Sequence, residues 1–230
     1  MNVSEHNQPL SRFILLLMTT AITATVANLY YSQPILPLIA HEFRLTDWQL
    51  GSIPALTQLG YAFALLFISP LGDSIPRRRL INILSGLLIV ACSAAVIAPN
   101  LPTLLVAVFL IGVSANITQQ LIPFAASMVS ADKKGATLGT LMMGLTVGIL
   151  LSRTVSGFMA ENFSWRSVFI MSAGLAVVFG ILLSIFLPTN KPQTNLRYLP
   201  LLKSTLSLFS KHKSLKIFTL TGACWFASFN

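Results

Sequence analysis

The chain has 230 residues, of which 54% belong to the hydrophobic set AVILMFWYC and only 9% are charged, against about 45–50% and 25% in soluble domains. Several apolar stretches reach the roughly 20 residues that a helix needs to cross the hydrocarbon core. This composition excludes an ordinary soluble domain and predicts an integral membrane protein. The formal net charge of +9 raises the question of nucleic acid binding, which the placement of the charges answers.

Seven hydrophobic stretches follow one another along the chain. They are expected near residues 13–39, 49–71, 79–98, 102–128, 137–160, 166–187 and from 216 onward. None shows the alternating pattern of a barrel strand, so each is expected to be an α-helix, whose backbone groups are satisfied within the segment. The first is too long for the core of a signal peptide and contains polar residues, which predicts an uncleaved first helix.

Basic residues are concentrated in alternate loops. One side collects Arg12, Arg77–Arg79, Lys133, Lys134, Lys191, Arg197, Lys203, Lys211, Lys213 and Lys216. The opposite side holds only Arg44 and Arg166, and Arg153 falls inside a span. Because Lys and Arg mark the cytoplasmic side, we expect a multi-pass protein of a bacterial-type inner membrane with a cytoplasmic amino terminus. The positive charge reflects topology and contact with the lipid bilayer, and no nucleic acid partner is expected.

The cysteines and histidines form no catalytic or metal-binding pattern. Cys92 and Cys224 both lie in apolar spans, which gives neither a disulfide framework nor metal-ligand spacing. The histidines, His6, His41 and His212, lie in loops or the tail, and no HExxH, GxSxG or Walker sequence is present. We therefore expect a protein that is not an enzyme and has no metal or cofactor.

The first and second halves of the six complete spans share a pattern. The matching positions are Leu50-Gly51 with Leu138-Gly139, Asp73 with Glu161, Arg77 with Arg166, and Ala27-Asn28 with Ala115-Asn116. Three-helix units of opposite topology produce such a pattern, and inverted repeats are common in secondary transporters.

The loop between the second and third spans reads SPLGDSIPRRRL over residues 69–80. It resembles the loop signature of the major facilitator superfamily, G-x-L-a-D-r-x-G-r-k/r. Leu71, Asp73, Arg77 and Arg78 match, whereas Ser69, Ser74 and Pro76 replace the two glycines and a basic residue. The resemblance implies that Asp73, Arg77 and Arg78 form a conformational switch that joins two six-helix halves on the cytoplasmic side. The alternative is that the arginines only enforce topology.

The fifth span carries a second resemblance. Residues 135–169, ending in Trp165, Arg166 and Phe169, are similar to the fifth helix and following loop of facilitator-superfamily drug/proton antiporters. Small residues recur every four positions at Thr140, Gly144, Gly148, Ser152 and Ser156, with Gly157 beside the last. Such a stripe allows another helix to approach closely. The resemblance implies that this partner is the eighth helix, in the other half.

Arg153 stands where the antiporter motif has proline. A charge at mid-helix depth costs at least about 2.5–3.5 kcal/mol, so it should face a partner or a watery cavity. The open alternatives are a substrate anion, a carboxylate on another helix, or carbonyls and polar side chains of the first and fourth spans. We expect a cavity-facing Arg153, with a purely structural arginine as the alternative.

Uncharged polar residues at spanning depth are further candidates for a substrate cavity. They are Asn28, Tyr31 and Gln33 in the first span, Gln58 and Tyr61 in the second, and Asn116, Gln119 and Gln120 in the fourth. The family's fold would place them, with Arg153, between helices one, two, four and five. The alternative for each is a helix–helix contact. Prolines at 34, 37, 54 and 123 predict kinks or helix ends.

The resemblance covers the whole chain but only half of a transporter built from two six-helix halves. It predicts a six-helix bundle over residues 1–187, a basic inter-half loop over 188–215 and an incomplete seventh helix over 216–230. The expected function is secondary active export of a small organic solute or drug by alternating access. The expected partners are this small-molecule substrate and either a carboxy-terminal half or a second copy. The alternative is a non-functional remnant of a disrupted gene that inserts without transporting. Proton coupling is left open, since neither the first nor the fourth span contains an acid.

Overall fold

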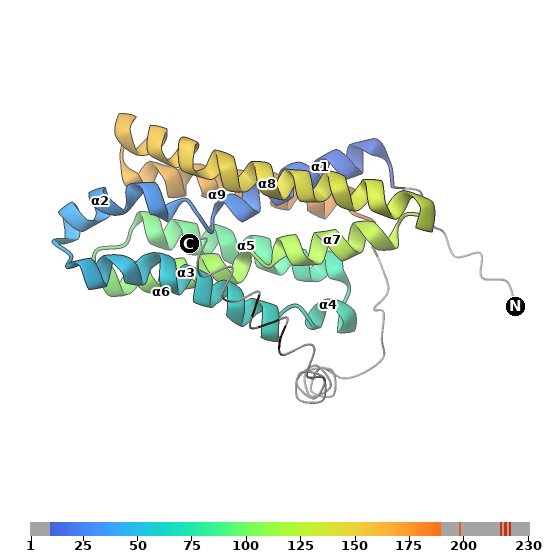
Figure 1. Ribbon diagram of the computed structural model, residues 1–230, viewed down its shortest axis with the longest axis horizontal. Helices are drawn as coiled ribbons and strands as arrows, with labels where there is room; N and C mark the ends of the chain where they lie inside the picture. Colours follow the sequence, from blue (N-terminus) through green and yellow to red (C-terminus); the bar gives the residue numbers. More distant parts are fainter. Residues whose placement is uncertain (1–9, 190–197, 199–216, 218, 220, 222–230) are drawn as a thin grey trace, which may run out of the picture.

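The computed structural model describes residues 10–189 and the single residues 198, 217, 219 and 221, and its described part is built from α-helices (Figure 1). They are α1 (Arg12–Ala27), α2 (Ser32–Phe43), α3 (Asp47–Phe67), α4 (Leu71–Ser74), α5 (Arg77–Val96), α6 (Leu101–Ser114), α7 (Ile117–Ser127), α8 (Ala131–Asn162) and α9 (Trp165–Phe186). α1 with α2, α3 with α4, and α6 with α7 each form one segment, whereas α5, α8 and α9 each form a segment alone. The described helices thus make six segments of membrane-spanning length. The prediction of an all-α, six-helix membrane bundle is confirmed. The predicted inter-half loop and seventh helix, 188–215 and 216–230, lie almost wholly outside the described residues.

Short polar residues determine where several helices begin. Ser11 accepts a hydrogen bond from the backbone N–H of the first turn of α1, and Asn100 and Ser164 do the same for α6 and α9. Thr46 and Gln49 form a reciprocal capping box at the start of α3. These caps satisfy N–H groups that have no partner within the helix, and those at Thr46, Asn100 and Ser164 lie where the chain turns between spans.

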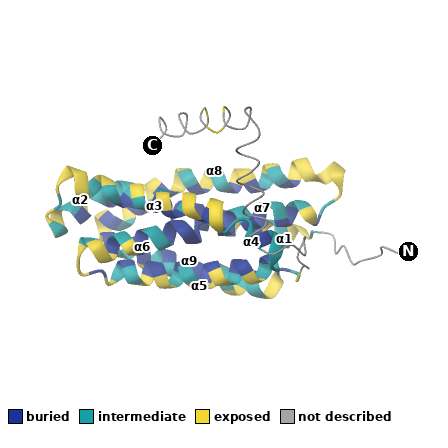
Figure 2. Ribbon diagram, turned by 90° about the horizontal axis from the view of Figure 1, so that it is seen from below, coloured by how far each residue is buried: buried dark blue, intermediate teal, exposed yellow. Residues whose placement is uncertain are grey.

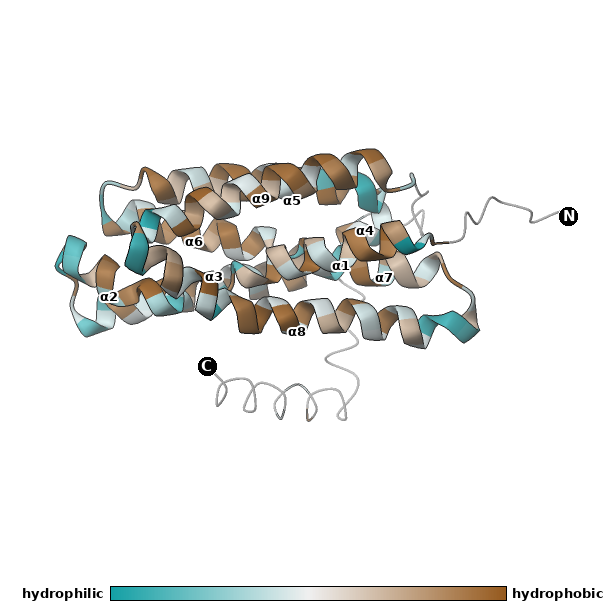
Figure 3. Cartoon of the chain, turned by 90° about the horizontal axis from the view of Figure 1, so that it is seen from above, coloured by the Kyte–Doolittle hydropathy of each residue, from teal (hydrophilic) through white to brown (hydrophobic). Residues whose placement is uncertain are grey.

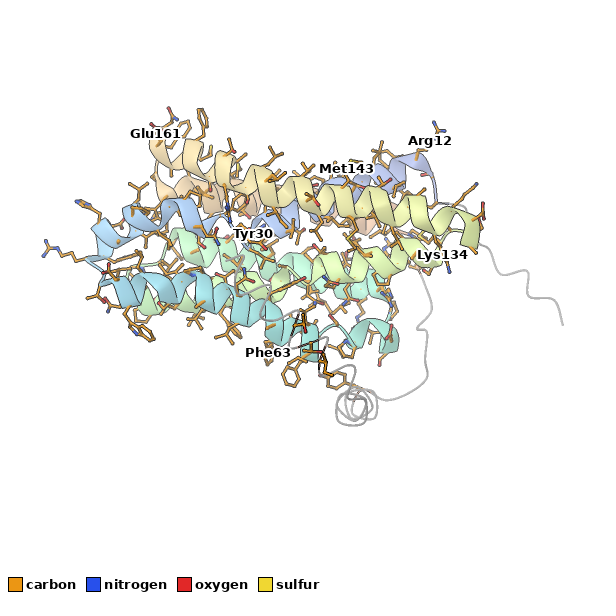
Figure 4. The ribbon with its side chains drawn as sticks, in the orientation of Figure 1. Arg12, Tyr30, Phe63, Lys134, Met143 and Glu161 are labelled. Atoms are coloured by element: carbon orange, nitrogen blue, oxygen red, sulfur yellow. The ribbon has the colours of Figure 1, made fainter. Side chains whose placement is uncertain are left out.

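Consecutive spans run in opposite directions, so the loops alternate between the two ends of the bundle (Figure 1). Arg12 and Lys134 lie at one end and Glu161 at the other (Figure 4). Apolar colour covers the middle of the helices and hydrophilic colour gathers near their ends (Figure 3). The described basic residues of the predicted cytoplasmic loops therefore share one end of the molecule.

The packing of the helices shows the internal repeat. α3 packs against α6, α8 packs against α1, and α5 packs against α9. The interval in sequence from Leu50 to Leu138 also carries α1 onto α6, α2 onto α7, α3 onto α8 and α5 onto α9. Under this mapping the α3–α6 pair corresponds to the α8–α1 pair, and the α5–α9 pair corresponds to itself. An inverted repeat requires this relation.

The first and fourth spans are broken at matching places. α1 and α2 are separated at residues 28–31, and α6 and α7 at 115–116. At the first break the N–H groups of Leu29 and Tyr30 bond three residues back, which is a tightened 3₁₀ turn. Pro34 follows one turn after Tyr30 and cannot donate to its carbonyl. The Tyr30 carbonyl accepts from the N–H of Gln33 instead, and the side-chain amide of Asn28 donates to the carbonyl of Ala24 at 2.9 Å.

Small residues bring helices into backbone contact. A Cβ atom added to Gly60 would overlap the carbonyl of Phe109 on α6, and one added to Gly144 would lie 2.8 Å from the carbonyl of Thr19 on α1. Gly148, Ser152 and Ser156 continue the buried face of α8 (Figure 2).

Within the described chain the small-residue stripe packs against α1, and its contact with an eighth helix stays a prediction. Gly144 and Gly148 pack against α1 of the same half, where Thr23 donates a hydrogen bond of 2.8 Å to the carbonyl of Gly144. Gly157 lies beside Pro34 on α2, with 4.0 Å between its added Cβ and that of the proline. Repetition of small residues predicts a close approach but does not specify which helix approaches.

Candidate functional site

The breaks in the first and fourth spans meet at the centre of the bundle. Val26, Leu29, Tyr30 and Ala115 form a buried apolar cluster that is separate from the main core. Side chains from α3 and α8, namely Tyr61, Leu145 and Ile149, pack against it. Tyr30 lies midway along the molecule (Figure 4). This cluster joins the four spans that were predicted to surround a cavity.

Polar residues of α3 and α7 meet beside the cluster. Gln119 donates a hydrogen bond of 2.7 Å from its Nε2 atom to the hydroxyl of Tyr61. Gln58 lies three residues before Tyr61, and therefore on the same side of α3. Gln58, Tyr61 and Gln119 are partly exposed, as is Gln33 near the start of α2. These four predicted cavity residues are thus partly accessible at the surface of the bundle.

Asn116 and Gln120 connect the break in the fourth span to the loop between spans two and three. Asn116 donates a 2.8 Å hydrogen bond to Ser69, and Gln120 donates a 2.9 Å hydrogen bond to Asn116. The Gln120 side chain also fills the space where Gly72 lacks a Cβ atom. Both amides are buried, so in this structure they are helix–helix contacts and not open cavity surface.

Asn28 and Tyr31 are likewise buried. The Asn28 Oδ1 atom accepts hydrogen bonds from Ser172 on α9 and Cys92 on α5. Tyr31 belongs to the main core. In this structure both side chains therefore make helix–helix contacts within their own half-bundle, which was the alternative to a cavity position.

The predicted switch residues lie at the basic end of the bundle. Arg77 forms an ion pair of 2.7 Å with Asp73, and the two are one helical turn apart in sequence. Arg78 donates from its guanidinium to the carbonyl of Ser184, near the end of α9. These two described contacts, Asp73 with Arg77 and Arg78 with Ser184, both lie within one half.

A polar cluster of Glu42, Trp165 and Arg166, here called the outer cluster, lies at the opposite end. Glu42 accepts 2.6 Å hydrogen bonds from both Trp165 Nε1 and Arg166, whose Nε donates at 3.0 Å to the carbonyl of Val96. The sequence repeat paired Arg166 with Glu161, which is exposed. Glu42 was missed, since it lies in a different span and nothing in its local sequence specifies the partner.

The register of the repeat relates the two ends. It carries Arg78 onto Arg166 and Ser184 onto Val96. Each arginine thus begins one of the antiparallel helices α5 and α9 and bonds the carbonyl near the end of the other. Arg78, rather than Arg77, is the counterpart of Arg166.

Arg153 lies on α8 with its side chain exposed and its charge within electrostatic reach of Tyr30. Its guanidinium makes no hydrogen bond or ion pair with the residues that the structure describes. The alternative of an arginine bonded to carbonyls of the first and fourth spans therefore has no support among these contacts.

Family comparison agrees with this geometry. The family model described as Major Facilitator Superfamily matches residues 15–230. The chain belongs to the Major Facilitator Superfamily. Its broken spans and inverted repeat are accordingly features of a facilitator half, and its relatives in this family are named as transporters.

Two facilitator relatives give the scale of the match. The chain is 40% identical over 233 residues to the uncharacterized transporter YgaY of Escherichia coli O157:H7, covering 99% of this chain and 58% of the relative. It is 34% identical to the probable transporter SCO4007 of Streptomyces coelicolor, covering 80% of this chain and 43% of the relative. The chain therefore spans about half the length of these relatives and corresponds to an amino-terminal half.

A solved structure shows the same fold. A peptide transporter crystallised in complex with sulfate aligns with a TM-score of 0.65 at 16% identity, covering 95% of this chain and 50% of that one. At this identity the likeness concerns the fold alone. The family match, the six membrane-length segments and the shared fold together describe a facilitator half in a multi-pass membrane protein.

Proposed function

We propose that the chain acts as the amino-terminal half of a secondary transporter that exports a small organic solute by alternating access. The observation that carries the proposal is the pair of matching breaks at residues 28–31 and 115–116. Discontinuous helices at mid-membrane depth are typical of transporter substrate sites. Gln33 follows the first break in sequence, Gln119 follows the second, and both are partly exposed amides, as is Gln58 on α3.

The hydrogen bonds from Asn116 to Ser69 and from Gln120 to Asn116 supply a route for coupling. They link the break in the fourth span to the segment that carries Asp73. A substrate that shifts the break would move the α4 segment, whose ion pair with Arg77 is made or lost with conformation. A contact made in one state only biases a two-state equilibrium.

The proposal extends to the setting of the transporter. The chain would lie in a bacterial-type inner membrane with a cytoplasmic amino terminus, and would function with a carboxy-terminal half or a second copy. No metal or organic cofactor is invoked. Every Asp and Glu of spans one to six lies near a span end, so a proton-coupling acid at mid-membrane depth would come from the other half.

Cysteine accessibility tests the cavity without knowledge of the substrate. In a chain with Cys92→Ser and Cys224→Ser, we expect Gln58→Cys to react in membranes with a water-soluble, membrane-impermeant thiol reagent. Leu59→Cys is the matched control, because it lies one position further round α3 and is 58% exposed at the surface, where lipid would cover it. Reaction of Gln58→Cys from each side of the membrane supports alternating access. No reaction from either side would contradict a water-filled pathway.

A further inference from the structure

Arg153 lies at the depth of the broken helices. One turn before it on α8, Ile149 packs against the cluster of Val26, Leu29, Tyr30 and Ala115. One turn after it, Gly157 lies beside Pro34 at the start of α2. Residues four apart lie on one side of a helix. Arg153 therefore projects on the side of α8 that faces the break in the first span.

The same positions separate Arg153 from the buried packing face of α8. That face consists of Gly144, Gly148, Ser152 and Ser156, which pack toward the first span. Arg153 follows Ser152 by one residue, a rotation of about 100°, and is exposed. It is thus beside the contact with the first span but not covered by it.

The charge of Arg153 is uncompensated among the described residues. Neither described ion pair includes it, and its guanidinium donates to no described acceptor. The carboxylates of α8 itself, Asp132 and Glu161, lie at the two ends of this helix. An isolated charge at this depth is costly, and an anionic ligand that binds beside Arg153 would offset that cost.

We propose that Arg153 forms an anion-binding site beside the break in the first span and selects organic solutes that carry a carboxylate or phosphate group. The proposal rests on the transporter function proposed above and names its substrate class. A guanidinium presents a planar fork of donors that matches such groups in a bidentate manner.

Charge selectivity of a neighbouring cysteine tests the site in the chain as it exists. With Cys92→Ser and Cys224→Ser, Ile149→Cys is treated in membranes with the anionic sulfonatoethyl and the cationic trimethylammonioethyl methanethiosulfonates. We expect Arg153→Gln to lower the anion-to-cation ratio of reaction rates about tenfold, because the two residues are one turn apart. Arg153→Lys should retain most of the ratio. Lys134→Gln, which removes a positive charge from the end of the same helix, should leave it unchanged.

Ligand protection supplies the second measurement. Benzoate or phenyl phosphate should slow the reaction of Ile149→Cys with neutral N-ethylmaleimide, benzamide should not, and Arg153→Gln should abolish the difference. An unchanged charge ratio in Arg153→Gln, or equal effects of these anions and benzamide, would overturn the anion site while leaving the cavity intact. Failure of Ile149→Cys and Gln58→Cys to react with any reagent would overturn the cavity and the transporter proposal as well.

Discussion

Arg78 and Arg166 occupy the first turns of α5 and α9, where the dipole of their own helix disfavours a positive charge. Each guanidinium instead bonds a carbonyl near the carboxyl end of the antiparallel neighbour, Ser184 for Arg78 and Val96 for Arg166. A helix carboxyl end favours cations and leaves carbonyls without intrahelical partners. The arginines therefore stabilise the antiparallel pair of α5 and α9 at both ends.

The outer cluster gives a prediction about stability. Glu42→Gln should lower the free energy of unfolding by about 0.5–1 kcal/mol, because the pair is partly exposed and solvent screens it. Arg166→Gln should cost more, about 1–3 kcal/mol, since it also removes donors from the carbonyls of Val96 and Ala98. Unfolding in mild detergent measures both. The double variant should cost less than the sum, whereas Arg166→Gln with Glu161→Gln should be additive; additivity in both pairs would contradict the Glu42 contact.

Asp73 gives a prediction about conformation. Its ion pair with Arg77 joins α4 to α5. Asp73→Asn should shift the ratio of inward to outward reaction of Gln58→Cys about fivefold, as loss of roughly 1 kcal/mol from one state requires. Asp132→Asn removes an exposed acid from the first turn of α8 at the same end and should leave the ratio unchanged. If Asp73→Asn and Asp132→Asn gave the same ratio of inward to outward reaction, the loop would determine topology only and would not act as a switch.

The helices pack in pairs through glycines at equivalent positions of the repeat. Gly60 on α3 meets α6, and Gly148 on α8 meets α1. The register that relates Leu50 to Leu138 carries the first glycine onto the second. Backbone contact at both positions gives α3 and α8 the same depth against their partners, and so places Gln58 and Arg153 beside the central break.

Substitution of Gly60 tests this element-level contact. Gly60→Ala should destabilise the bundle by about 1–3 kcal/mol, because the new methyl group overlaps the Phe109 carbonyl and backbone cannot yield as a flexible side chain does. Gly86 is the matched control, since nothing lies within 4 Å of its added Cβ. Gly86→Ala should be neutral or stabilise by up to about 1 kcal/mol through helix propensity. Equal unfolding midpoints for the two variants would contradict close packing at Gly60.

At the scale of the whole molecule, the sequence predicts what hydropathy and spacing encode. Six spans and the inverted repeat follow from residues that are close together or regularly spaced. The burial of Asn28 does not, because it depends on how a 3₁₀ turn rotates the first span about its axis. The contact of Glu42 with Arg166 depends on two spans that are distant in sequence. Periodicity fixes which residues share a face, and tertiary packing decides what that face meets.

Orientation in the membrane is the remaining property that belongs to the whole chain. The end that carries Arg12 and Lys134 (Figure 4) should face the cytoplasm, because basic loops are retained there. Lys134→Cys should react with an impermeant reagent only from the cytoplasmic side, and Trp48→Cys, at a site 87% exposed at the opposite end, only from the other side. Right-side-out and inside-out vesicles measure the two rates in one background. The reverse pattern would invert the bundle and place Asp73, Arg77 and Arg78 outside, where they could not act as a cytoplasmic switch.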